Sequence, residues 1–167
     1  LIEDFETQSF ESFNWVNSGD SEWSIDESSY SGFYSARSGD IGDDQTSELS
    51  VVMNVLYEGE ISFWAKASSE SNGDDFLEFY IDNQSQNINL HGDSDWQEFS
   101  VNVPVGNHLL SWVYQKDNSQ SSGEDCAWVD LIQFPPGAVS PLNIDFGDLN
   151  SDNIINILDV IVTVNSV

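Results

Sequence analysis

Basic residues are almost absent from this 167-residue chain. Arg37, Lys66 and Lys116 stand against 30 aspartates and glutamates, and the formal net charge is −27 at pH 7. A surface of this sign repels nucleic acids and anionic membranes, so we exclude both as partners. It attracts divalent cations instead. Adaptation to a salty environment and calcium handling are two compatible explanations, because salt screens the self-repulsion and calcium neutralises it.

Cysteine and long apolar runs are also scarce. The single cysteine, Cys126, excludes a disulfide within the chain, and the apolar run Cys126-Ala127-Trp128-Val129 predicts a buried, inert thiol. No stretch is long and apolar enough to span a membrane. The sequence starts at Leu1 and shows no basic segment followed by an apolar one. We therefore interpret it as a mature or excised part of a secreted protein whose targeting signal has been removed.

Aromatic residues are abundant, at 13% of the chain, and many lie in short runs that alternate polar and apolar residues. Such runs, separated by clusters of Gly, Ser, Asn and Asp, are typical of strands joined by turns. We therefore predict an all-β fold, an antiparallel β-sandwich of the jelly-roll type, over residues 1–136. Two prolines end it, residues 137–145 form a linker, and residues 146–167 form a short calcium-loop tail. The strand-like runs are 2–5, 23–25, 33–36, 49–52, 58–66, 76–81, 96–103, 108–114 and 127–134.

The tail contains a twelve-residue segment, 148–159, in which oxygen-bearing side chains recur at a regular spacing. Calcium prefers about six to eight oxygen ligands, and a loop of this length can wrap them around one ion. The sixth position is Asn153, which tolerates the sharp turn that glycine usually makes there. We therefore predict a calcium loop; the alternative is a solvated Asn/Asp turn. Its ligands are the side chains of Asp148, Asn150, Asp152, Asn156 and Asp159 and the backbone carbonyl of Ile154.

This segment, with Gly147 before it and Val160-Ile161-Val162 after it, resembles one calcium-binding repeat of a type I dockerin. The resemblance implies an extracellular protein that binds calcium. Dockerins carry two such repeats and bind cohesins through paired helices, whereas this sequence carries one. Docking to a cohesin therefore ranks third among the functions that the sequence allows. The apolar run Ile155 to Val164 is expected to form a short helix or, because it is rich in β-branched residues, a strand.

The first 136 residues are similar to the MAM-like and carbohydrate-binding-module jelly rolls of secreted bacterial proteins. The similarity is carried by the order and spacing of Asp4-Phe5-Glu6, Trp15, residues 30–39, residues 59–64 and residues 125–132. In such jelly rolls a structural calcium commonly joins a carboxylate of the opening segment to one of the closing segment. The resemblance thus implies a second calcium site at Glu6 and Asp130, with backbone carbonyls near residues 30–32. The alternative is that both are ordinary edge residues.

Residues that could carry catalysis form no recognisable arrangement. The sequence has no nucleophile elbow, phosphate loop, zinc motif or paired Cys and His, and His91 and His108 lie beside turn residues. Acidic residues are so numerous that the proximity of two of them carries no information. We therefore predict that the chain is not an enzyme.

Aromatic side chains offer a binding function instead, because sugar rings stack on exposed indole and phenol faces. The turn-proximal candidates are Trp15, Trp23, Tyr57 and Trp96. Those expected in the core, because they lie within alternating runs, are Trp64, Trp112 and Trp128.

Two functions follow from these patterns. The first is a secreted, calcium-binding, non-catalytic module that binds a glycan or another surface ligand as part of a larger extracellular protein. The second is a structural protein that assembles with copies of itself, because calcium would neutralise like-charged subunits and the apolar tail would connect neighbours. Light scattering with and without millimolar calcium distinguishes them, since a chain that stays monomeric contradicts assembly.

Overall fold

The computed structural model describes residues 1–119 and 121–140. The predicted calcium loop at residues 148–159 and the rest of the tail lie outside the described residues. Within them the chain forms two antiparallel sheets and no helix, which confirms the predicted β-sandwich. Accordingly, the described residues include no helix that could cross a membrane.

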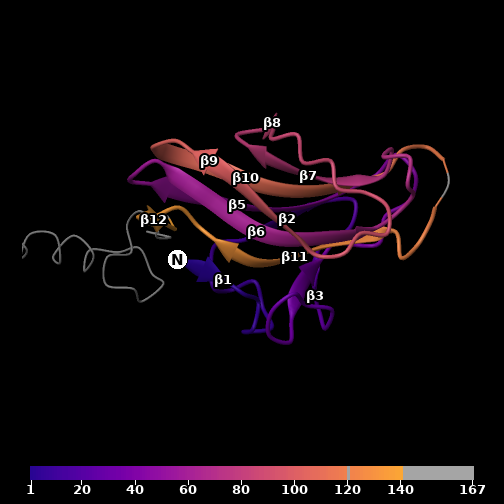
Figure 1. The fold of residues 1–167 in the computed structure, drawn as a ribbon, viewed down its shortest axis with the longest axis horizontal. Helices are drawn as coiled ribbons and strands as arrows, with labels where there is room; N and C mark the ends of the chain where they lie inside the picture. The colour runs from indigo at the N-terminus through magenta and orange to yellow at the C-terminus, as the bar shows by residue number, and fades with distance from the viewer. Residues whose placement is uncertain (120, 141–167) are drawn as a thin grey trace, which may run out of the picture.

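The sandwich consists of two six-stranded sheets whose long strands run along the long axis of the molecule, so that loops gather at its two ends (Figure 1). One sheet has the order β3-β4-β11-β6-β9, with β1 also paired to β11, and is called the β6 sheet. The other has the order β12-β5-β10-β7-β8, with β2 also paired to β5, and is called the β5 sheet. The strands are β1 (Ile2–Glu3), β2 (Val16–Gly19), β3 (Ser24–Asp26), β4 (Ser35–Arg37), β5 (Thr46–Val55), β6 (Gly59–Ser68), β7 (Phe76–Ile81), β8 (Gln84–Ser85), β9 (Gln97–Val103), β10 (Gly106–Gln115), β11 (Cys126–Gln133) and β12 (Ala138–Val139).

The core lies between the two sheets and is centred on aromatic side chains. Phe63 of β6 packs against Phe79 of β7 and Trp112 of β10, with ring centroids 5.1 and 5.4 Å away. All three side chains are fully buried. Successive residues of a strand point to opposite faces of the sheet. Because Ile61 and Phe63 are buried in the core, Trp64 lies on the outer face of the β6 sheet. The expectation that Trp64 belongs to the core is therefore wrong.

Other tryptophans also lie in places that differ from the expectation. Trp23, expected near a turn, is buried in the core, and Trp15 packs on Trp112 with ring centroids 5.7 Å apart. Trp128 is buried outside the core cluster. Cys126 is buried as predicted, and burial raises the pKa of its thiol to about 12, although Arg37 opposes part of the rise. Such a thiol is almost entirely protonated at neutral pH and is inert as a nucleophile.

Candidate functional site

Asp130, in the middle of β11, anchors the loop that joins β3 to β4. Its Oδ2 accepts hydrogen bonds from the backbone N–H groups of Tyr30 at 2.8 Å and Ser31 at 2.9 Å. Its Oδ1 accepts from the N–H of Leu131 at 2.7 Å. The register of β11 against β6 shifts immediately after Asp130, and Leu131 has a φ of 46°, which is uncommon for a leucine. The carboxylate thus holds both the irregular backbone of β11 and the loop that packs on it.

Burial raises the pKa of the Asp130 carboxyl, and the amides of Ser31, Leu131 and Tyr30 offset part of that rise. The neighbouring Glu6 carboxylate raises it further. Asp130 is fully buried beside a second acid, so its charged form has lost its hydration. The hydrogen bonds that it accepts are what stabilise that charge. Asp130 is therefore a structural anchor with three amide donors.

Glu6 holds the other half of the same loop. Its Oε1 accepts hydrogen bonds from the N–H groups of Phe33 at 2.7 Å and Tyr34 at 2.9 Å. Gly32 has a φ of +71°, and a Cβ added there would collide with the Glu6 carboxyl group. The structure therefore brings the two predicted residues, Glu6 and Asp130, together around residues 30–34, but as acceptors of backbone amides.

The hydrogen bonds that these two carboxylates accept leave few of their oxygens free to bind a cation. A carboxylate oxygen offers about two lone pairs, so the two amide bonds to Asp130 Oδ2 use that atom fully. The oxygens that remain are Asp130 Oδ1, which accepts one bond, and Glu6 Oε2. Carboxylate oxygens are ligands that calcium accepts, although the loop is already anchored by its amide bonds without an ion.

The anchored loop presents an aromatic platform on the outer face of the β6 sheet. The Tyr30 ring lies parallel to that of Trp64, with centroids 3.6 Å apart and an interplanar angle of 7°. Trp96 packs against Tyr30 at an angle of 59°. One face of the Tyr30 ring is thus covered by the Trp64 indole. The side chain is 41% exposed, so part of it is open to solvent. A flat, rigid, half-exposed ring of this kind is suited to stacking on an apolar ring of a ligand.

Next to the platform, the outer face of the β6 sheet forms a polar groove of about 500 Å³. Trp64 of the platform is directly paired with Glu98 of β9, which lines the groove. The volume lies within the range of about 300–1,000 Å³ that is usual for ligand pockets. The lining residues are Gly59, Glu60, Ser62, Glu98, Ser100, Gln133, Phe134 and Pro136. The groove is rich in hydroxyl, amide and carboxylate groups and has the Tyr30 platform beside it.

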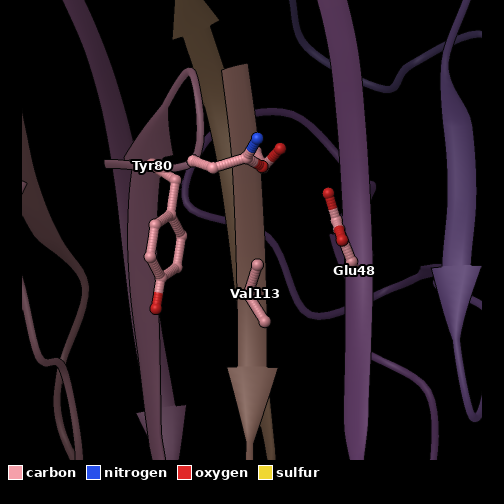
Figure 2. A pocket seen from close by; sticks show the side chains of 5 residues that line it. Glu48, Tyr80 and Val113 are labelled. Carbon is pink, nitrogen blue, oxygen red and sulfur yellow. The ribbon is translucent and has the colours of Figure 1, made fainter. Parts of the chain in front are cut away.

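The outer face of the β5 sheet carries a smaller hollow of about 130 Å³. Figure 2 shows the Tyr80 ring and the Glu48 carboxylate on either side of Val113. Burial, followed by the charges of Glu78 and Glu48, raises the pKa of the Tyr80 hydroxyl, so this phenol remains protonated at neutral pH. This hollow is about a quarter of the volume of the groove on the β6 sheet, and we regard the β6 groove as the candidate ligand site.

The basic side chains and histidines of the chain are engaged in internal contacts. Lys66 Nζ lies 4.1 Å from the centre of the Trp128 ring and donates to Ser28 Oγ at 2.7 Å. His108 Nδ1 lies 2.7 Å from Asp82 Oδ2. Within residues 1–119 and 121–140 the other ring nitrogen of His108, Nε2, is buried and has no hydrogen-bond partner.

The structure brings Glu6 and Asp130 to one loop, and their role as calcium ligands stays a prediction. The groove and the Tyr30 platform were missed from the sequence. The groove depends on the register of three strands: Ser62 of β6 lies opposite Ser100 of β9 on one side and Gln133 of β11 on the other. No local motif encodes that register. The alternation in β6, however, could have placed Trp64 on the outer face. The six predicted ligands between Asp148 and Asp159 lie beyond the described residues.

Solved structures of other proteins are similar to this fold. No protein-family model matches the chain, and no curated protein matches its sequence. A solved structure of a family 61 carbohydrate-binding module in complex with β-1,4-galactotriose is 15% identical, with a TM-score of 0.57 over 82% of this chain and 94% of that one. A cleaved adhesin domain of Lys-gingipain from Porphyromonas gingivalis is 14% identical, with a TM-score of 0.57 over 79% and 95%. A family 35 carbohydrate-binding module from an environmental isolate is 9% identical, with a TM-score of 0.52 over 84% and 96%.

Because these sequence identities are low, the similarity shows the fold alone. The chain has the β-sandwich architecture of carbohydrate-binding modules, which confirms the coarser part of the resemblance seen in the sequence. The same architecture also occurs in a bacterial adhesin domain. The ligand therefore has to be argued from the groove and the platform of this chain.

Proposed function

We propose that this sandwich is a non-catalytic module that binds a neutral glycan in the groove formed by β6, β9 and β11. The observation that carries the proposal is the Tyr30–Trp64 stack beside a polar groove of about 500 Å³. Sugar recognition needs one apolar surface for the faces of the rings and hydrogen-bonding groups for the hydroxyls, and the two features supply both. Similarity in fold to a carbohydrate-binding module solved with β-1,4-galactotriose supports it.

The charge of the groove favours neutral over acidic glycans. Glu60 and Glu98 line it, and the three basic side chains of the chain lie in other contacts. Carboxylates accept hydrogen bonds from sugar hydroxyls strongly, because charge-assisted bonds are about twice as strong as neutral ones. The same carboxylates, on a chain of net charge −27, repel uronic acids and sulfated sugars.

Replacing Tyr30 by alanine should weaken glycan binding about 30-fold while leaving the sandwich folded. Truncating an aromatic anchor typically costs about 2 kcal/mol of binding free energy, which corresponds to this factor. Affinity gel electrophoresis on a panel of neutral and acidic polysaccharides, including β-1,4-galactan, measures retention of the wild type and the variant. Tyr80→Ala is the matched control, because Tyr80 is a partly exposed tyrosine on the outer face of the other sheet. Failure of the wild type to be retained by any neutral polysaccharide contradicts the proposed function.

Calcium and an extracellular location belong to the same proposal, and they are supported by the sequence. The oxygen spacing over residues 148–159 favours an ion there, and Glu6 with Asp130 supplies a further pair of acceptors around residues 30–34. Calcium at Glu6 and Asp130 would add to the amide bonds that already hold residues 30–34. Neither ion is needed to form the groove, because the strand register and the amide bonds to Asp130 already position it.

A further inference from the structure

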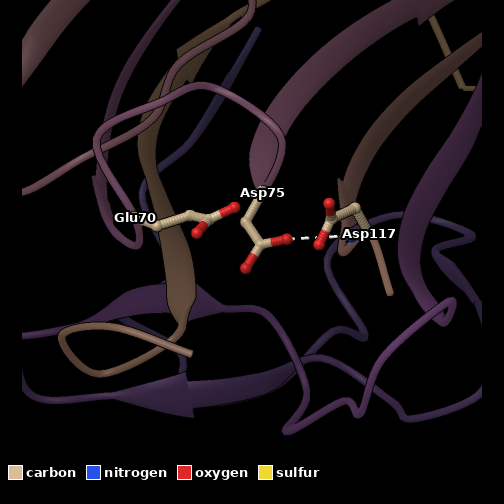
Figure 3. Close-up of side chains that lie close together, drawn as sticks. All are labelled: Glu70, Asp75 and Asp117. Carbon is tan, nitrogen blue, oxygen red and sulfur yellow. Dashed lines mark hydrogen bonds between the residues drawn. The ribbon is translucent and has the colours of Figure 1, made fainter. Parts of the chain in front are cut away.

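The β6–β7 loop and the end of β10 lie at the end of the sandwich away from the N-terminus (Figure 1). A second group of acidic side chains meets there. Glu70 and Asp75 lie at the two ends of the loop between β6 and β7, and Asp117 lies two residues after β10. One carboxylate oxygen from each lies within 4.8 Å of the other two. Figure 3 shows the three side chains converging, with the N–H of Asp117 donating to Asp75 Oδ1 at 2.9 Å.

Two of these carboxylates are deeply buried and incompletely paired. Asp75 is 0% exposed and Glu70 is 6% exposed. Asp75 Oδ2 and Glu70 Oε1 have no hydrogen-bond partner within the described residues, although both atoms are shielded from solvent. A buried carboxylate oxygen without a donor is costly, because it has lost its water and gained nothing in return. The orphaned oxygens therefore indicate a ligand that supplies positive charge.

The nearest cation of the protein does not satisfy the cluster. Lys116 Nζ lies 3.8 Å from Asp75 Oδ2, beyond hydrogen-bond distance. The same ammonium group donates to Asp125 Oδ2 and to Ser121 Oγ. This ammonium group is thus shared between Asp75 and Asp125, and the cluster of Glu70, Asp75 and Asp117 keeps a negative excess.

The protonation equilibria of the two buried acids agree with this geometry. Burial raises the pKa of Asp75, and the Asp117 amide and Lys116 offset only part of the rise. Burial also raises the pKa of Glu70; the Asn72 side chain opposes the rise, and the charges of Asp75 and Asp117 add to it. Without a cation, these acids must either bind protons or repel one another.

We propose that Glu70, Asp75 and Asp117 bind one calcium ion that fastens the β6–β7 loop to the segment following β10. Ca²⁺–oxygen distances are about 2.3–2.6 Å, so oxygens on opposite sides of one ion are about 4.6–5.2 Å apart. The 4.8 Å limit on the oxygen separations in the cluster lets a single calcium ion reach all three. A third segment is tied in, because the N–H of Asp44, between β4 and β5, donates to the carbonyl of Asp117 at 2.8 Å.

This site goes beyond glycan binding and is spatially separate from the groove. The groove lies at residues 59–62 of β6, whereas Glu70 follows the end of that strand. A ten-residue strand spans about 30 Å, so an ion at the cluster does not touch a ligand in the groove. Its role is to stabilise the loops at the far end of the sandwich.

The test uses the 167-residue chain with Asp148→Ala and Asp152→Ala, which removes the predicted calcium loop of the tail from the measurement. On this background Asp75→Asn is compared with Asp74→Asn, which removes the same charge from the adjacent, exposed residue. Asparagine at 75 keeps an oxygen for the Asp117 amide, so the variant is expected to fold. Glu70→Gln is a second variant of the same cluster.

Calorimetric titration with CaCl₂ should show one fewer bound ion per chain in Asp75→Asn and in Glu70→Gln, and no loss in Asp74→Asn. Calcium at about 100 times its Kd should raise the Tm of the background protein by about 5–10 °C more than that of Asp75→Asn. In EDTA, Asp75→Asn should melt at or above the background protein, because a buried repulsion has been removed. The proposal is overturned if Asp75→Asn keeps the full stoichiometry and the full calcium-dependent rise, or if it melts well below the background protein in EDTA.

Discussion

Replacing Asp130 by alanine should lower the free energy of unfolding by about 3 kcal/mol and abolish glycan binding. The substitution leaves three backbone N–H groups without their acceptor, those of Tyr30, Ser31 and Leu131. Hydrogen bonds to charged groups contribute about 1.5–3 kcal/mol each, and water entering the partly buried loop recovers part of the loss. The loop that carries the Tyr30 ring would then no longer be held against Trp64. Chemical denaturation gives the stability, and affinity electrophoresis gives the loss of binding.

A thermal melt offers a second readout of the same substitution. For a domain of this size, 3 kcal/mol corresponds to a fall in Tm of about 10 °C. Asp4→Ala is the matched control, because Asp4 is exposed and accepts a single local hydrogen bond, from the N–H of Glu6 at 3.2 Å. We expect that control to change stability by less than about 1 kcal/mol. Equal effects of the two substitutions would show that Asp130 has no special role as an anchor.

Replacing Trp112 by alanine should lower the free energy of unfolding further still, by about 3–5 kcal/mol. Trp112 is fully buried and contacts rings of both sheets: Phe63 at 5.4 Å, Phe79 at 4.8 Å and Trp15 at 5.7 Å between centroids. Its removal leaves a large cavity where the two sheets meet. The loss is a large share of the total of about 5–15 kcal/mol that such a domain has. Urea denaturation followed by circular dichroism measures it.

The indole nitrogen of Trp112 makes a finer test possible. Within residues 1–119 and 121–140, Nε1 is buried and has no hydrogen-bond partner. Trp112→Phe removes this unpaired donor and keeps an aromatic ring, so its cost should be no more than about half that of Trp112→Ala. Tyr57→Ala, on an exposed ring, should change stability by less than about 0.5 kcal/mol. A Trp112→Ala variant as stable as the wild type would contradict the assignment of the core.

Local alternation was sufficient to predict most of the long strands, but β5 was predicted only at residues 49–52 and extends over Thr46–Val55. β7 begins and ends at the predicted residues 76 and 81, and β6, β9, β10 and β11 lie within two residues of their predicted bounds. β2 (Val16–Gly19) was missed, because Val-Asn-Ser-Gly carries no alternating pattern and its strand conformation comes from pairing with β5. β12 falls in the predicted linker, where Ala138 and Val139 pair with the end of β5. The described sheet therefore extends beyond the predicted boundary at residue 136.

The candidate sites were harder to predict from the sequence than the strands. Glu6 and Asp130 could be paired through a family resemblance, and the structure shows that both hold residues 30–34. The Glu70, Asp75 and Asp117 cluster could not be found, because 30 acidic residues offer too many combinations. Its geometry follows from the register of β7 against β10, in which Phe76 lies opposite Gln115 and sets the flanking acids side by side. Long-range register of this kind is absent from any local pattern.

An amide NMR titration with a neutral oligosaccharide shows whether a neutral glycan binds in the groove of the β6 sheet. The oligosaccharide is taken from whichever polysaccharide retains the protein in gels. We expect saturable shifts of the amide signals of Ser62, Glu98 and Ser100, together with Tyr30. Shifts confined to the face around Tyr80, or no shift with any neutral oligosaccharide, would contradict the claim.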